Sequence, residues 1–383
     1  MADIESLSTA RLPRREQQRE LGVTLVELMV STCLATLACG LSFGIYARTS
    51  VAYKNQSHIS EVQQTLRVAS DLLTREIRQA GFFATAIRTA IADPNADPPF
   101  LSPIGIGNHA GAEGDDTISV AYADNTSMAR IVSSAGPSFN AAVTEVDSLG
   151  SFADGDIIFA VKTGGAQRGQ GCALKITGLI AAGGGSGPKI QHNPGQGQPW
   201  NMASNKQCDH LSGTWKDGQT VFTRFVYRSF RIDPGSAEGI LQMSPSGGME
   251  AGDWVNLAVG IVDIQFALRV FQNGDATDED GDGDPERDWF SSDEMATSLQ
   301  SGGAIVGEPI QVRMNLVART VAPVTGLATT ATPNLTVTGN PTHNSIGDQP
   351  SRALPVAAAG SRFAGNHLYR WSTTLVDLRN FLN

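Results

Sequence analysis

The fold is decided by Val23–Ala47, which reads VTLVELMVSTCLATLACGLSFGIYA. This stretch carries a single charge, Glu27, and as a helix it is long enough to cross a hydrocarbon layer of about 30 Å. Residues 1–22 before it are polar and contain four arginines. Because positive charge is retained on the cytoplasmic side of a membrane, these arginines predict a cytoplasmic N-terminus and an exported remainder.

The helix is predicted to continue beyond the membrane, because no proline follows it before Pro94. We predict one helix from about Thr24 to about Ala80, closed by Gly81 as its C-terminal cap. Apolar residues recur in its second half at spacings of three and four, namely at Ile59, Val62, Leu66, Ala69, Leu73, Ile77 and Ala80. This stripe would be buried either against a sheet of the same chain, which we favour, or against a coiled-coil partner.

After Gly81 the pattern changes to short β-rich runs separated by glycine, proline and aspartate. The candidate strands are Thr117–Tyr122, Ile157–Val161, Leu174–Ile176, Val221–Phe230, Ile261–Phe271, Ile310–Thr320 and His367–Thr374. The low-complexity stretches Gly164–Gly171, Ala181–Gly197 and Val321–Gly360 are predicted to be loops. One helix followed by antiparallel strands gives an α+β fold, in which a long N-terminal helix packs on a β-sheet head with large loop inserts.

The composition narrows the class of protein. The 383 residues include 41 glycines and 18 prolines, only 17% of them are charged, and the formal net charge is −10. An acidic chain of this kind lacks the basic surface of a nucleic-acid-binding protein. It also contains no phosphate-binding loop, no nucleophile elbow and no zinc-binding His-Glu-x-x-His helix, so we expect no enzyme.

The start of the apolar stretch resembles the type IV prepilin family. Gly22–Glu27 reads GVTLVE, and members of that family carry a glycine, a hydrophobic first mature residue, Thr-Leu-(Ile/Val)-Glu and then an apolar helix. The resemblance implies cleavage after Gly22 by a membrane prepilin peptidase and N-methylation of the new amine of Val23. The family usually has phenylalanine where this chain has Val23.

This resemblance implies three parts for the chain. Residues 1–22 would be the prepilin leader. Residues 23–81 would form the long N-terminal helix, with 23–47 crossing the membrane. Residues 82–383 would form a periplasmic β-rich head.

Glu27 needs a physical explanation, since a carboxylate in the middle of a membrane helix costs ~2.5–3.5 kcal/mol, and less near an end. It lies one turn from Val23, so its side chain could reach the cytoplasmic headgroups. We favour a second explanation, in which Glu27 pairs with the N-terminal amine of a neighbouring subunit and sets the axial register of the assembly.

Three later segments are similar to PilW-type minor pilins: the helix end Leu73–Phe82, the strand Gln311–Arg319 and the closing stretch Arg370–Asn380. The resemblance implies a minor pilin that primes or caps type IV pilus assembly and supports twitching motility. Its partners would be other minor and major pilins and the inner-membrane assembly machinery. It would lie in the inner membrane and then in the pilus, at the tip. The alternatives are a minor pseudopilin of a type II secretion system and a membrane-tethered surface-binding protein.

An acidic loop in the head is the strongest metal-binding pattern. Aspartates at alternate positions, Asp278, Asp280 and Asp282, are followed by Asp284, a spacing that suits Ca²⁺. The twelfth position of an EF-hand loop would be Trp289 rather than glutamate, so this is not an EF-hand. The loop either binds calcium, the one cofactor that the sequence suggests, or forms a solvated acidic hairpin tip.

The four cysteines fall into two pairs. Cys33 and Cys39 lie in the apolar stretch and are expected to be free. Cys172 and Cys208 lie in the exported part, where a disulfide between them would add roughly 3–4 kcal/mol of stability on the chain-entropy model. The alternative is two unpaired thiols.

Overall fold

The computed structural model describes residues 23–82, 103–107, 114–132, 142–164, 168, 171–193, 195, 200–201, 219–247, 252–276, 283–291, 300–301, 304–305, 307–322 and 367–380. The chain divides into two compact units, with the boundary between Lys54 and Asn55. The first unit is helical where it is described, and the second contains the end of the same helix together with all the described strands.

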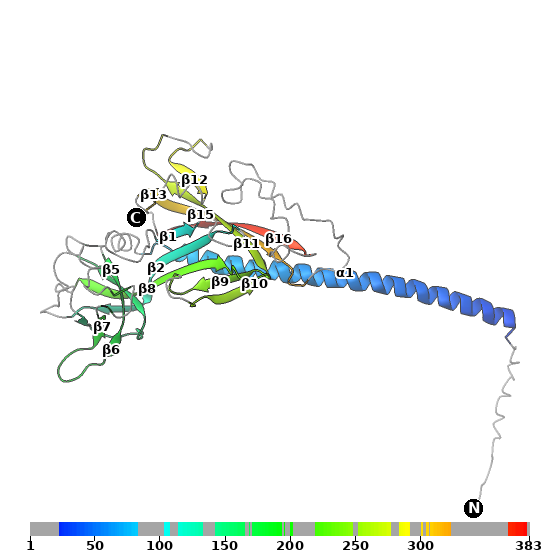
Figure 1. Cartoon of the computed structure of the whole chain (residues 1–383), viewed down its shortest axis with the longest axis horizontal. Helices are drawn as coiled ribbons and strands as arrows, with labels where there is room; N and C mark the ends of the chain where they lie inside the picture. The colour runs from blue at the N-terminus through cyan, green and yellow to red at the C-terminus, as the bar shows by residue number, and fades with distance from the viewer. Residues whose placement is uncertain are drawn as a thin grey trace, which may run out of the picture. The chain divides into compact units, whose positions relative to one another are not determined.

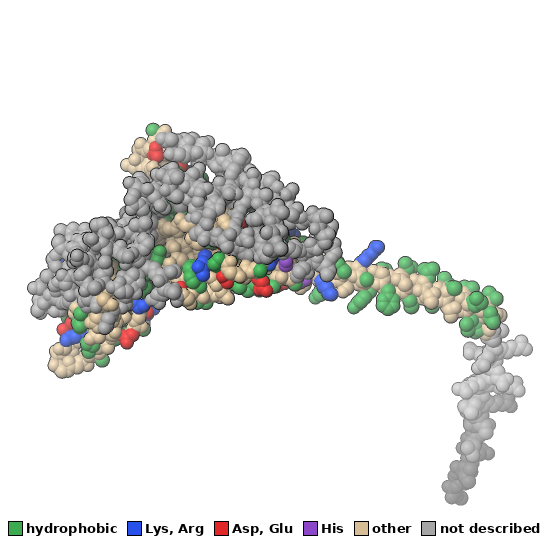
Figure 2. All heavy atoms as spheres, in the orientation of Figure 1, with side chains coloured by type: hydrophobic (Ala, Val, Ile, Leu, Met, Phe, Trp, Pro, Cys, Tyr) green, Lys and Arg blue, Asp and Glu red, His purple; other side chains and the backbone are tan. Residues whose placement is uncertain are grey.

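Helix α1 (Leu25–Gln79) has 55 residues and lies one residue inside each predicted end. In the first unit its large apolar side chains are exposed, and Leu25, Leu34 and Phe43 each leave more than half of their surface uncovered. Figure 2 shows hydrophobic side chains along this part of the helix. An 18-residue window has a mean hydropathy of 1.9 and no buried residue, so the helix is long and apolar enough to cross a membrane.

In the second unit the helix buries one stripe. The buried apolar residues are Val62, Leu66, Ala69, Leu73, Ile77 and Ala80, and the last three are fully covered. They belong to one core cluster with residues of the two largest sheets, and Figure 1 shows α1 passing along their strands. The predicted stripe is confirmed from Val62 to Ala80, where it packs on the chain's own sheets, whereas Ile59, its first predicted residue, is only half-buried.

The larger sheet has seven antiparallel strands. Five lie in the order β1 (Ile104–Gly107), β2 (Thr117–Arg130), β8 (Thr220–Ile232), β4 (Ile157–Lys162) and β5 (Gly171–Lys175). The other two are β9 (Ile240–Ser244), which pairs with β8, and β10 (Val255–Val259), which pairs with β9. β8 therefore pairs with β4 near its start and with β9 near its end. Its two ends contribute to different clusters of the core.

The second sheet has four antiparallel strands in the order β12 (Arg287–Ser291), β11 (Ile261–Phe271), β15 (Glu308–Arg319) and β16 (Tyr369–Asp377). Smaller sheets are formed by β3 (Val143–Glu145), β7 (Lys189–Gln191) and β6 (Gly178–Ile180), and by β13 (Gln300–Ser301) and β14 (Ala304–Ile305). Nearly all of β11 is buried, and its apolar residues Ile264, Phe266 and Leu268 belong to the core cluster that includes helix α1.

The α+β fold class is confirmed, and each of the seven predicted strands is present. Ile261–Phe271 has its predicted bounds. The interpretation of Ala181–Gly197 as a loop without strands is wrong, because β7 lies within it and buries Ile190. A strand of three residues with one apolar side chain is too short to show an alternating pattern. Of Val321–Gly360, all but the first two residues lie outside the described part of the chain.

Candidate functional site

At its N-terminus, α1 begins with a reciprocal cap between Thr24 and Glu27. The backbone N–H and the hydroxyl of Thr24 both donate to Oε2 of Glu27, each at 3.0 Å, and the N–H of Glu27 donates to the Thr24 hydroxyl at 3.2 Å. This is a capping box, which satisfies helix-end donors that otherwise lack partners. It also gives the carboxylate of the predicted assembly residue a local hydrogen-bond partner.

Only one oxygen of Glu27 is used in this way. Oε1 accepts no hydrogen bond from the described part of the chain, and the side chain is exposed. Val23 is also exposed, at 70%. Gly22 lies outside the described residues, so cleavage after it and pairing of Glu27 with a neighbouring amine stay predictions.

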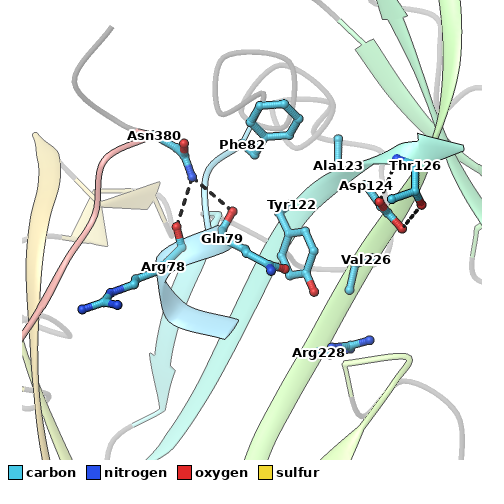
Figure 3. Close-up of a pocket in the computed structure, with 10 residues that line it drawn as sticks. All are labelled: Arg78, Gln79, Phe82, Tyr122, Ala123, Asp124, Thr126, Val226, Arg228 and Asn380. Carbon is cyan, nitrogen blue, oxygen red and sulfur yellow. Dashed lines mark hydrogen bonds between the residues drawn. The ribbon is translucent and has the colours of Figure 1, made fainter. Parts of the chain in front are cut away.

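The C-terminal end of α1 is closed by a side chain from the far end of the sequence. Gly81 has a φ of 80°, the left-handed conformation expected of a C-terminal cap. The amide nitrogen of Asn380 lies 3.2 and 3.4 Å from the carbonyl oxygens of Arg78 and Gln79 (Figure 3), and 3.2 Å from that of Ala80. The carbonyl of Gln79 also accepts a hydrogen bond from the N–H of Phe82 at 3.3 Å. Asn380 therefore caps carbonyls at the end of the helix, where the i+4 partners of the helix run out.

The turn after the helix is joined to β2. The N–H of Gly81 donates to the carbonyl of Ala121 at 3.0 Å, and the N–H of Ala123 donates to the carbonyl of Phe82 at 3.2 Å. These two bonds fix the helix end beside the middle of the strand. They bring Tyr122, between the two bonded strand residues, up to the last turn of the helix.

A buried ion pair lies at this junction. Glu76 is 2% exposed. Its Oε1 lies 2.6 Å from Nη1 of Arg228, on β8, and 3.3 Å from Nη2 of Arg75. The hydroxyl of Tyr122 donates to its Oε2 at 2.9 Å. Both carboxylate oxygens are thus satisfied inside the chain, as a buried charge requires.

Tyr122 stays a neutral donor in this arrangement. Burial raises the pKa of its hydroxyl far above the ordinary value; the nearby Arg228 guanidinium opposes this rise and the Glu76 carboxylate adds to it. Since the Tyr122 hydroxyl keeps its proton, it can donate to Glu76 throughout the physiological pH range.

Sequence analysis missed this cluster. Glu76 lies three residues after Leu73 and four before Ala80, so it falls on the apolar stripe. A charged residue at a stripe position is a signal of a buried, partnered charge. Tyr122 and Arg228 gave no comparable signal, because only the pairing of β2 with β8 brings them to the helix.

A pocket of about 450 Å³ opens beside the cluster. It is lined by Arg78, Gln79, Phe82, Tyr122, Ala123, Asp124, Thr126, Val226, Arg228 and Asn380 (Figure 3). One wall is made by a bulge in β2, where Asp124 pairs with Arg224 but the next paired residue is Met128. The lining combines two arginines and one aspartate with three apolar side chains, so it does not select for a ligand of one charge.

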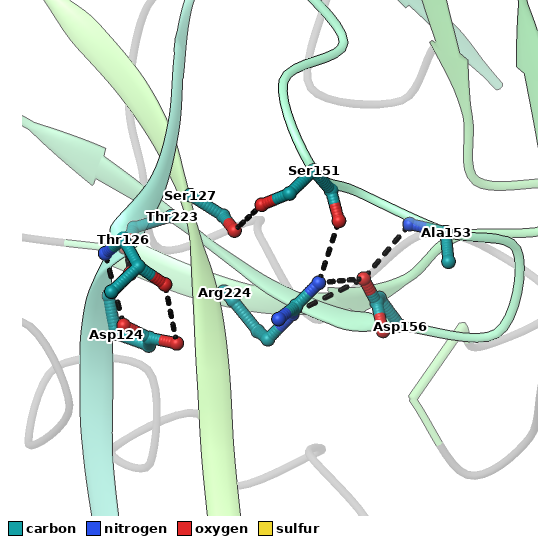
Figure 4. A network of polar contacts seen from close by, with 8 residues as sticks. All are labelled: Asp124, Thr126, Ser127, Ser151, Ala153, Asp156, Thr223 and Arg224. Atoms are coloured by element: carbon teal, nitrogen blue, oxygen red, sulfur yellow. Dashed lines mark hydrogen bonds and ion pairs between the residues drawn. The ribbon is translucent and has the colours of Figure 1, made fainter.

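Polar contacts hold the bulge in place (Figure 4). Asp124 accepts hydrogen bonds from the N–H and the hydroxyl of Thr126, each at 2.9 Å. On the neighbouring strand, Nη2 of Arg224 lies 2.8 Å from Oδ2 of Asp156 and donates to the carbonyl of Ser151 at 2.7 Å. The charged side chains of this network bond to one another and to the backbone, and so connect β2, β8 and the turn before β4. Their role is structural.

The acidic loop lies at the end of a hairpin formed by β11 and β12, whose terminal residues Phe271 and Arg287 pair. Three of the four predicted calcium ligands, Asp278, Asp280 and Asp282, lie outside the described residues. The fourth, Asp284, lies 3.1 Å from Nη1 of Arg287. Among the described residues no group of three His, Cys, Asp or Glu side chains could hold a metal ion. Calcium binding stays a prediction.

The described cysteines agree with the prediction of two free thiols on the helix and a disulfide in the head. Cys33 and Cys39 are free and exposed on α1. Cys172 is fully buried on β5 and is disulfide-bonded. Its predicted partner, Cys208, lies outside the described residues, so the pairing itself stays a prediction.

No protein-family model matches the chain, and no curated protein matches its sequence. Among solved structures, the chain is similar to a type IV-like pilin from Thermus thermophilus. The two share 9% sequence identity over 84% of this chain and 98% of that chain, with a TM-score of 0.33. A score this low does not establish a common fold, so function has to be argued from the residues of this chain.

Proposed function

We propose that this chain is a minor pilin that primes or caps type IV pilus assembly and so supports pilus biogenesis and twitching motility. One observation carries the proposal: the first part of α1 is apolar and exposed on all sides, while its second part is built into the core of the head. A helix that is apolar all round needs lipid or other apolar helices around it. The same segment would therefore serve first as a membrane anchor and later as the packed centre of a filament.

The start of the helix supports the assembly step. Cleavage after Gly22 by a prepilin peptidase would free the amine of Val23 for methylation. The capping box fixes the Glu27 side chain at the helix end and leaves Oε1 without a partner in the described chain. That oxygen would accept the positive amine of a neighbouring subunit, which would offset the desolvation of both charges.

The head supports an exported location. Cys172 is disulfide-bonded, and disulfides persist in oxidising compartments such as the bacterial periplasm. The protein would wait in the inner membrane with its head in the periplasm and would then join other minor and major pilins. A head of this size would clash in a regular shaft, which favours a position at the pilus tip.

Replacement of Glu27 tests the proposal. We expect the protein to begin at Val23 after processing, and we expect Glu27→Gln to be processed normally but to be absent from sheared pili. N-terminal sequencing and immunoblots of membrane and pilus fractions measure the two steps. Glu61→Gln, on the exposed side of the same helix and outside the apolar part, is the matched control and should assemble normally.

The outcomes separate the alternatives. A mature protein that starts at another residue, or normal assembly of Glu27→Gln, would contradict the proposal. A deletion strain that keeps twitching but loses protein secretion would indicate a minor pseudopilin of a type II secretion system. A strain with normal pili and secretion but reduced attachment would indicate a surface-binding protein.

A further inference from the structure

Strand β16 (Tyr369–Asp377) lies at the edge of the four-stranded sheet. It pairs with β15 along its whole length, and no register shift interrupts the pairing. In the described part of the chain no strand pairs with its other side. An edge of this kind presents a row of backbone groups to which another strand can bond.

The hydrogen bonds at the two ends of the pair show which residues face outward. The N–H of Thr320 donates to the carbonyl of Leu368 at 3.0 Å, and the N–H of Leu378 donates to the carbonyl of Ile310 at 2.8 Å. Residues of an antiparallel strand alternate between facing the partner and facing away from it. Even-numbered residues of β16 therefore bond to β15, and the N–H and C=O groups of Trp371, Thr373, Leu375 and Asp377 point away from the sheet.

The side chains of these outward residues form an exposed row. Trp371 is 46% exposed and Leu375 is 54% exposed, and both lie on the same face with Thr373 between them. The hydroxyl of Thr373 donates to Oδ1 of Asn315 at 2.6 Å, which orders the centre of the row. Within the described residues, these large apolar side chains stand beside backbone groups that no other strand pairs with, which is unusual for a sheet edge.

Two other edges carry protection that the described part of the chain does not give to β16. At the β5 edge, the amide of Asn201 accepts from the N–H of Lys175 at 2.9 Å and donates to its carbonyl at 2.7 Å. At the β10 edge, the pairing is irregular between Asn256 and Ala258. The stretch Trp371–Val376 of β16 contains no charge, no proline and no irregularity.

The edge is also held rigidly from behind. Val376 is fully buried in the main core. The hydroxyls of Thr374 and Ser70 share a hydrogen bond of 2.9 Å, which connects the inner face of β16 to helix α1. A strand that is already ordered loses little freedom when it binds, so more of the contact energy appears as affinity.

We propose that the outer edge of β16 binds an extended segment of another protein as an added strand. Main-chain hydrogen bonds to Trp371, Thr373 and Leu375 provide the affinity, and alternate side chains provide the selectivity. The segment has apolar side chains beside Trp371 and Leu375 and a basic side chain beside Asp377, the exposed acid at the end of the row. This inference does not depend on the role in pilus assembly.

A labelled peptide tests the proposal on the full chain in detergent. The probe is fluorescein-labelled Lys-Thr-Val-Thr-Thr-Thr-Val, which in antiparallel pairing places lysine beside Asp377 and its valines beside Leu375 and Trp371. We expect saturable binding by fluorescence anisotropy. N-methylation of the third and fifth peptide residues, whose amides face β16, should weaken binding at least about tenfold, and N-methylation of the fourth and sixth should change it less than about threefold.

A substitution in the strand gives a second, independent readout. Thr373→Pro removes one outward N–H and leaves the bonds to β15 in place, because proline is tolerated where an edge N–H faces solvent. We expect it to weaken peptide binding at least about tenfold, whereas Thr373→Val, which keeps the N–H, binds within about threefold of the wild type. Thermal unfolding of both variants checks the fold, and the methylated peptides keep the test valid if Thr373→Pro unfolds.

Three results would overturn the inference. The first is equal binding of the two methylated peptides. The second is full binding by a folded Thr373→Pro variant. The third is self-association of the purified chain that Thr373→Pro abolishes, since the occupant would then be a second copy.

Discussion

Helix α1 carries one carboxylate near each end, and the two are satisfied in different ways. Glu76 is buried, and Tyr122 and Arg228 complete both of its oxygens within the chain. Glu27 is exposed, and Thr24 completes only one. A carboxylate with both oxygens hydrogen-bonded inside the chain stabilises the fold. A carboxylate with one oxygen that accepts no hydrogen bond from the described chain can bind a donor from a second molecule. The difference assigns Glu76 to stability and makes Glu27 the candidate for assembly.

The largest expected effect comes from breaking the buried pair. Glu76→Ala leaves the Arg228 guanidinium without its partner, and the free energy of unfolding should fall by about 3 kcal/mol, the lower end of the range for buried pairs because Arg228 is one-third exposed. Urea unfolding in detergent, followed by tryptophan fluorescence, measures the change. Glu27→Ala is the control and should leave the unfolding midpoint where it is. If Glu76→Ala and Glu27→Ala lower the unfolding midpoint equally, the conclusion that only Glu76 stabilises the fold is wrong.

A second test extends the comparison to His192, a buried group that is only partly satisfied. Its Nε2 lies 3.1 Å from the Thr144 hydroxyl, and its Nδ1 has no side-chain partner among the described residues. Burial lowers the pKa of His192 to about 4, from an ordinary value of 6.5. The unfolded chain therefore binds a proton that the folded chain excludes, so stability is full above pH 6.5 and is lost as the pH falls towards 4.

At pH 5 this loss should amount to about 2 kcal/mol relative to neutral pH. His192→Gln removes the titrating group, so its urea midpoint should fall less than that of the wild type between pH 7.5 and pH 5. Both midpoints are measured under the same conditions. If the two proteins lose stability in parallel, the acid sensitivity comes from other groups.

The smallest expected effect concerns the cap at the C-terminal end of the helix. Asn380→Ala removes the amide that lies close to three helix carbonyls, and water would replace it in part, so the expected loss is about 1 kcal/mol. Hydrogen exchange at the last turn of α1 should rise in the same variant. Arg379→Ala, at an exposed neighbouring position, should change neither quantity. A similar response from both variants would show that Asn380 has no special part in closing the helix.

The sequence was sufficient for the features that depend on local pattern. The bounds of α1 and its buried stripe were predictable because apolar residues recur at helical spacing and no proline interrupts them. The long strands β11 and β15 were predictable for a similar reason, since each contains a continuous run of buried residues. The C-terminal cap at Gly81 followed from the lack of a side chain at a position that needs a left-handed backbone.

The features that depend on distant pairing were not predictable. Glu76 fell on the apolar stripe, but its partners lie on β2 and β8, and only the register between those strands places them together. The three-residue strands β3, β6 and β7 are too short to show a period. The exposed edge of β16 depends on the order of strands in the sheet, which the sequence of the strand does not contain.

The position of Asn380 and β16 in the chain has a consequence for how the head is made. Every other described strand precedes them, yet β16 lies at one side of a sheet and Asn380 caps the C-terminal end of α1, the first described element. The final turn of α1 therefore lacks these hydrogen bonds until residues 369–380 have been synthesised and have folded onto it. A chain that ends before these residues lacks the hydrogen bonds of Asn380 and the pairing of β16. The end of α1 and the edge of the sheet would then open more readily and be more accessible to proteases.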